Sequence, residues 1–191
     1  KQFGLHQSQL DTISTTYFCA GVLSWVPGMI LDKKGPRFTI VLGGSLMGTA
    51  LTLYWAICRK IIHIHSTGTV IFFLCLFGVI TFFGSACVTG ASFATLSRNH
   101  PTCSGTAVGV AKGWVGLCGG MYTQIWTGFV GKPDDSARTL DFILMAAALS
   151  FGVNLALSPL MSVSTDTVKL TDTLRPHHFQ ICYGILVLMG V

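Results

Sequence analysis

The chain has 191 residues, of which 51% are hydrophobic and 10% are charged, whereas an ordinary soluble domain has roughly 25% charged residues. Its mean hydropathy is +0.65. These values exclude an ordinary soluble domain and indicate a membrane protein. The net charge of +5 does not indicate nucleic-acid binding, because Lys and Arg stand at the ends of apolar runs rather than in a patch with interleaved aromatic residues.

Five apolar runs approach or exceed the length of about 20 residues that a helix needs to cross a bilayer. They lie near residues 12–31, 38–58, 69–95, 104–130 and 141–161, and residues 179–191 resemble the opening of a sixth run. A membrane β-barrel is disfavoured, because these runs do not alternate apolar and polar side chains. The sequence therefore predicts an all-α, multi-pass integral membrane protein, a polytopic bundle of transmembrane helices in a lipid bilayer.

The breaks between the runs are short, so consecutive helices are expected to be antiparallel. Residues 1–11 are expected to precede the first helix outside the membrane, and residues 162–178, rich in Ser and Thr, to form a linker. The positive-inside rule needs an excess of Lys and Arg on one side, and here six such residues oppose five. The chain lacks an initial Met and stops inside an apolar run, so we expect a piece of a longer protein.

The break at residues 28–37 concentrates charge in a chain that has little of it. Its sequence is Gly-Met-Ile-Leu-Asp-Lys-Lys-Gly-Pro-Arg. The Gly-Pro pair favours a sharp turn, and basic residues are common where a chain leaves a bilayer. The end of a membrane helix does not explain Asp32, because a carboxylate at the C-terminal end of a helix is disfavoured by about 0.3–1 kcal/mol. Asp32 therefore needs a partner, either a basic residue or the N-terminus of another helix.

Two interpretations of this break stay open. One is an interfacial turn anchored by its basic residues, which leaves Asp32 unexplained. The other is a gate in which Asp32 contacts another part of the protein, and Arg98, expected on the same side of the membrane, is a candidate partner. Gly28 would permit a close contact between helices.

Lys112 is the charge that lies well within an apolar run, about 12 Å from Ser104 at 1.5 Å per residue. Helical periodicity places it on a face of small and polar residues: Gly105, Gly109, Lys112, Gly116, Gly119, Gly120, Thr123 and Thr127. Small residues usually pack against other helices, so Lys112 is expected to point into the bundle. An ionisable residue there indicates a functional site and favours an anionic solute. A purely structural lysine, satisfied by helix-end carbonyls or an acid, stays open as the alternative.

Two motifs resemble known families. Residues 28–37 resemble the loop between the second and third helices of the major facilitator superfamily, and the residues that match are Gly28, Asp32, Lys33, Gly35 and Arg37. The Asp-Lys-x-Gly-Pro-Arg form is similar to the monocarboxylate and oxalate:formate branch. Residues 98–124 resemble the fifth helix of the nodulin-like group, and the residues that match are Arg98, Asn99, Pro101, Gly105, Gly109, Lys112, Gly113, Gly116 and Leu117.

This resemblance implies that residues 1–161 form an N-terminal transmembrane half, of the six-helix type, that lacks its first helix. Residues 162–178 would be a cytoplasmic linker and residues 179–191 the start of a further helix. The implied function is secondary active or facilitated transport of a small solute by alternating access. The gate would consist of Gly28, Asp32, Lys33, Gly35, Arg37 and Arg98, and the substrate path of Lys112, Gly109, Gly116 and Thr123.

Other functions find less support in the sequence. A non-transporting receptor or scaffold that keeps this fold is the alternative. An enzyme is not expected, because the spans hold no G-x-S-x-G, H-E-x-x-H or paired carboxylate. The seven cysteines lack C-x-x-C spacing and are expected to be reduced, and His63 and His65 are expected in a polar loop, so we expect neither a metal nor a cofactor.

Overall fold

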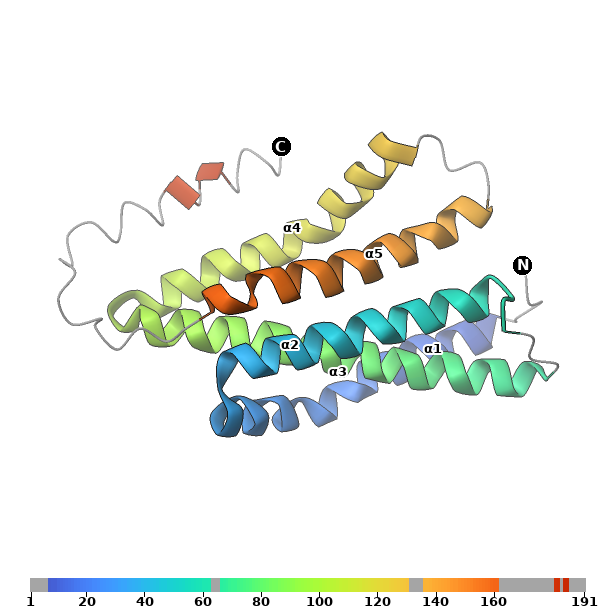
Figure 1. The fold of residues 1–191 in the computed structure, drawn as a ribbon, viewed down its shortest axis with the longest axis horizontal. Helices are drawn as coiled ribbons and strands as arrows, with labels where there is room; N and C mark the ends of the chain where they lie inside the picture. The colour runs from blue at the N-terminus through green and yellow to red at the C-terminus, as the bar shows by residue number, and fades with distance from the viewer. Residues whose placement is uncertain (1–6, 63–65, 131–135, 162–180, 183, 186–191) are drawn as a thin grey trace. The chain divides into compact units, whose positions relative to one another are not determined.

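The structure, a computed structural model, describes residues 7–62, 66–130, 136–161, 181–182 and 184–185. All regular structure in these ranges is helical (Figure 1), which confirms the all-α prediction for this part of the chain. The elements are α1 (Gln7–Cys19), η1 (Ala20–Ser24), α2 (Trp25–Cys58), α3 (Thr67–Asn99), η2 (Pro101–Cys103), α4 (Ser104–Val130), α5 (Ser136–Leu157) and η3 (Ser158–Leu160). The predicted linker at residues 162–178 lies outside the described residues.

The chain divides into two compact units. The first unit comprises Lys1–Ala91 and Pro133–Leu160, and the second comprises Ser92–Lys132 and Met161–Val191. The first unit therefore contains α1, α2, most of α3 and α5, and the second contains α4.

Within the first unit, the chain reverses direction at Gly35. The backbone there has φ 82° and ψ 171° although helix continues on both sides, and Figure 1 shows the chain turning back within α2. Pro36 follows directly, and proline suits the first turn of the second helical segment, where its missing N–H has no helical acceptor. The predicted sharp turn is confirmed. It is shorter than the predicted break at residues 28–37, because helix continues on either side of Gly35.

Glycines on α2 let it approach two neighbouring helices closely. A Cβ atom built on Gly43 would lie 2.6 Å from the carbonyl oxygen of Gly84 on α3. One built on Gly44 would lie 2.6 Å from the Cβ of Asn154 on α5, and one on Gly48 would lie 3.0 Å from the Cβ of Phe151. Such distances leave no room for a side chain, so α2 packs against α3 along one edge and against α5 along the other.

The end of α2 that is remote from Gly35 packs into a small apolar core. Ile57 of α2 is buried together with Val70 and Leu74 of α3, and Ile13 of α1 packs against this cluster. Because α1 reaches the same cluster as the last turn of α2, the chain before Gly35 and the chain after it lie side by side and antiparallel.

Three described stretches are long and apolar enough to cross a membrane: Gln7–Cys58, Thr67–Asn99 and Leu140–Leu160. The first has 52 residues, which at 1.5 Å per residue far exceeds a hydrocarbon core of about 30 Å. The reversal at Gly35 divides it into two parts of suitable length. Helix α4 is not among the three stretches, since glycines and Lys112 dilute its apolar residues.

Candidate functional site

The predicted gate segment surrounds the reversal at Gly35. Asp32, Lys33 and Arg37 are exposed side chains on the two helical segments that meet there, and Gly28 is exposed one turn earlier. Asp32 lies in the last turn before the reversal, as its position in the sequence predicts. The structure thus places the five residues of the loop motif at one end of the first unit.

Thr39 stabilises this turn and was not singled out from the sequence. Its side chain is fully buried, and its hydroxyl donates a hydrogen bond of 2.8 Å to the carbonyl oxygen of Gly35. The non-helical conformation of Gly35 is thereby tied to the next helical turn. Arg98 is exposed at the end of α3 and belongs to the second unit, so its contact with Asp32 stays a prediction.

Most of the described residues on the Lys112 face of α4 are exposed. Lys112 and Gly116 are exposed, Thr123 is exposed as well, and Gly109 is half-buried. No described atom lies within 4 Å of the position that a Cβ would take at Gly105, Gly116 or Gly119.

On the opposite side of α4, Ala107 and Val110 are buried. The packing of the small-residue face against other helices stays a prediction.

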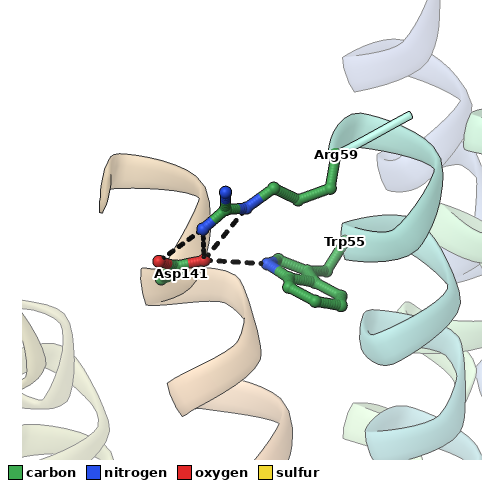
Figure 2. Close-up of polar contacts among 3 residues, drawn as sticks. All are labelled: Trp55, Arg59 and Asp141. Atoms are coloured by element: carbon green, nitrogen blue, oxygen red, sulfur yellow. Dashed lines mark hydrogen bonds and ion pairs between the residues drawn. The ribbon is translucent and has the colours of Figure 1, made fainter. Parts of the chain in front are cut away.

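An ion pair that the sequence did not predict joins α2 to α5. Arg59 and Asp141 are 82 positions apart, and Figure 2 shows one edge of the Arg59 guanidinium facing the Asp141 carboxylate. Nη2 of Arg59 donates to both carboxylate oxygens, at 2.6 Å and 2.7 Å, and Nε donates to Oδ1 at 3.2 Å. This is the two-pronged geometry that makes arginine–carboxylate pairs strong and directional.

Trp55 completes this cluster. Its Nε1 donates to Oδ1 of Asp141 at 3.2 Å, and its ring centroid lies 5.8 Å from Cζ of Arg59, within the range of a cation–π interaction. The side chains of Arg59 and Asp141 remain 34% and 33% exposed. The pair therefore stands at the rim of the helical packing rather than in its core.

The end of α2 positions Arg59 in this cluster. The amide of Lys60 donates to the carbonyl of Ile57, and the amide of Ile61 donates to the carbonyl of Ala56. These two bonds form a Schellman motif, which requires a left-handed residue after the helix. Lys60 has that conformation with φ 59°, and Arg59 is the capping residue. The sequence did contain a signal for the pair, because antiparallel runs place the end of the second run and the start of the fifth on the same side.

The first unit also has an open pocket of about 330 Å³ that is lined by residues of α1, α2, α3 and α5. Its lining is mostly apolar and aromatic, with hydroxyl groups from Ser14, Tyr17, Tyr54 and Thr81. That volume lies at the lower end of the range of ligand pockets, which are typically apolar with a few polar groups. The residues that line it include none with a charge.

Among the described residues, no three His, Cys, Asp or Glu side chains come together as a metal site would require. All seven cysteines lie in the described part of the chain and are free thiols, as the sequence indicates.

Apolar helices, close glycine contacts and a charged helix-end cluster define an α-helical membrane protein. The chain belongs to the nodulin-like family, whose model matches residues 1–191. This family is of transporter type rather than enzymatic, and membership indicates a role related to membrane transport. No curated protein and no solved structure matches the chain.

Proposed function

We propose that the chain forms most of the first half of a multi-pass transporter of the major facilitator type. Residues 1–161 would supply the second to sixth helices of that half, and a small solute would cross by alternating access. The transport would be secondary active or facilitated. The principal support is Lys112, an exposed charged side chain on the open face of α4.

A lysine in this position can face lipid only at a substantial cost in free energy. Placing Lys at the centre of a membrane helix costs about 2.5–3.5 kcal/mol on insertion scales, and Lys112 lies about 12 Å into α4 counted from Ser104. A water-filled path removes most of that cost. The exposed glycines beside Lys112 leave room for such a path, and Thr123 adds a hydroxyl to the same face.

The charge of Lys112 favours an anionic solute, and the Asp-Lys-x-Gly-Pro-Arg sequence at residues 32–37 supports the monocarboxylate and oxalate:formate branch. Small carboxylates are therefore the first solutes to test. Gly28, Asp32, Lys33, Gly35, Arg37 and Arg98 would form the gate. In this proposal Asp32 would hold the two halves together on the cytoplasmic side until the transporter opens.

The test is uptake of labelled small mono- and dicarboxylates into liposomes that contain the full-length protein. Lys112→Ala should abolish uptake or change the preferred solute while the protein still inserts into the membrane. Lys60→Ala, which removes a charge at a helix end, is the matched control and should transport nearly normally. Normal kinetics in Lys112→Ala would contradict the role of this lysine, and a full-length protein inert towards organic anions, amino acids and metal chelates would favour a receptor or scaffold.

A further inference from the structure

We propose that the seam between α2 and α5 is a binding site for a sterol of the surrounding membrane. The inference rests on a groove in the first unit that the transport proposal does not use. The groove has a volume of about 520 Å³. Its floor is made by Gly48 and Ala147, which are buried, and its walls by Thr52, Leu53, Leu144 and Phe151, which are exposed.

The groove leads to the Arg59–Asp141–Trp55 cluster. On α2, residues 48, 52, 55 and 59 are spaced by four, three and four, so they share one helical face. On α5, residues 141, 144, 148 and 151 share a face in the same way. Because Gly48 contacts Phe151 and Arg59 contacts Asp141, the two faces run alongside one another from the groove to the cluster. From Gly48 to Arg59 the distance along the helix is about 16 Å, long enough for the ring system of a sterol.

The level of the cluster fits the hydroxyl group of a membrane lipid. The apolar stretches of α2 and α5 end at Cys58 and begin at Leu140, so Arg59 and Asp141 lie at the edge of the hydrocarbon. Trp is typical of that level, and Trp55 points its indole N–H at the carboxylate. The groove therefore lies in the hydrocarbon region and its polar end at the interface.

The chemistry of the two ends favours a sterol over a phospholipid. The Arg59–Asp141 pair has no net charge, so a phosphate headgroup gains little from it. Oδ2 of Asp141 accepts one hydrogen bond from Arg59, and a carboxylate oxygen has a second lone pair that can accept a bond from a neutral hydroxyl. A flat, rigid ring system can lie on the smooth floor of Gly48 and Ala147, and it loses less conformational entropy on binding than a flexible acyl chain does.

The experiment uses the full-length protein in phosphatidylcholine vesicles with a trace of a photoreactive 3β-hydroxysterol, or of a photoreactive phosphatidylcholine, and maps the labelled peptides. The sterol probe should label residues 48–59 and 141–151. Unlabelled 3β-hydroxysterol should compete about tenfold better than the matching 3-ketosteroid, because the ketone cannot donate to Asp141 and a hydrogen bond to a charged group is lost.

Ala148→Phe should fill the groove and remove most of the sterol labelling, since Ala148 lines the groove and is exposed. Ala156→Phe makes the same change at an exposed position of α5 outside the groove and should label as the native protein does. Equal labelling of the seam by the phospholipid probe, unchanged labelling in Ala148→Phe, or equal competition by the ketosteroid would each overturn the proposal.

Discussion

Replacing Gly84 by Ala should force α2 and α3 apart where they cross. The added Cβ would lie 2.7 Å from the carbonyl oxygen of Gly43 and 2.9 Å from the amide nitrogen of Met47. Both are backbone atoms that cannot rotate away. Restoring ordinary contact needs a shift of roughly 0.5–1 Å, which forfeits about a quarter to a half of the dispersion energy across the contact. Overpacking of this kind typically costs about 1–3 kcal/mol.

Cys87 can report this change, because it packs directly at the crossing. Its side chain is 0% exposed, and its Cβ lies 2.7 Å from the position of a Cβ on Gly43. A maleimide therefore reaches it only when the helices separate. A loss of 1–3 kcal/mol would raise the labelling rate of Cys87 by about 5- to 150-fold. Peptide-resolved mass spectrometry can measure that rate, with the exposed Cys19 as an internal reference that should not change.

Gly90→Ala is the matched control on the same helix. No described atom lies within 4 Å of the position of its Cβ, so the change adds a methyl group without a clash. Cys87 should label at the native rate or more slowly in this variant, because Ala favours helix over Gly. If Gly84→Ala and Gly90→Ala gave the same rates at Cys87, the close crossing of α2 and α3 would be refuted.

Three further predictions concern the turn and the ion pair. Gly35→Ala should lower the free energy of unfolding by about 1–3 kcal/mol, because φ 82° with ψ 171° is a conformation that only glycine adopts readily. Gly28→Ala is the control, because open space surrounds Gly28, and it should leave the melting temperature in detergent nearly unchanged. Equal effects of the two substitutions would contradict backbone strain at position 35. A double-mutant cycle of Arg59→Ala and Asp141→Ala should give a coupling energy of at most about 1 kcal/mol, since both side chains are one-third exposed and exposed pairs contribute little; a coupling several times larger would mean that the pair is shielded from water. Asp32→Asn should slow the exchange between inward- and outward-open states more than it weakens solute affinity, measured by single-molecule fluorescence and equilibrium binding, and a pure loss of affinity would refute the gate.

Much of the fold could be predicted because length and hydropathy determine it. A run of about 20 apolar residues has few alternatives to a helix in a bilayer. Helical structure covers the five apolar runs, although α1 and α5 begin at Gln7 and Ser136 rather than near residues 12 and 141. The turn at Gly35 was equally accessible, because Gly and Pro restrict the backbone locally. The first residue of α1 was harder to predict from hydropathy. The helix begins at Gln7, because polar residues such as Gln7 and Asp11 can be helical without being apolar.

The ion pair between Arg59 and Asp141 could not be predicted from the hydropathy of the apolar runs. The antiparallel order of the runs places both residues on the same side, but it does not say which of the basic residues there is paired. The choice follows from the Schellman turn at Lys60, which orients Arg59, and from the close packing of α2 on α5 at Gly44 and Gly48.

Glycine-rich faces illustrate what a pattern of glycines alone leaves open. On α2, Gly43, Gly44 and Gly48 are buried against backbone or side chains of neighbouring helices. On α4, Gly105, Gly116 and Gly119 have no described atom nearby, although their spacing is as regular. A glycine removes an obstacle, and only the surface opposite it decides whether a helix or a space takes the room. The charge of Lys112 distinguishes the glycine face of α4 from that of α2. The glycines of α2 are flanked by apolar residues and accept a neighbouring helix. Lys112, in the middle of the α4 face, needs water or an anion beside it. The same residue type therefore supports close packing on one helix and, in the transport proposal, a solute path on the other.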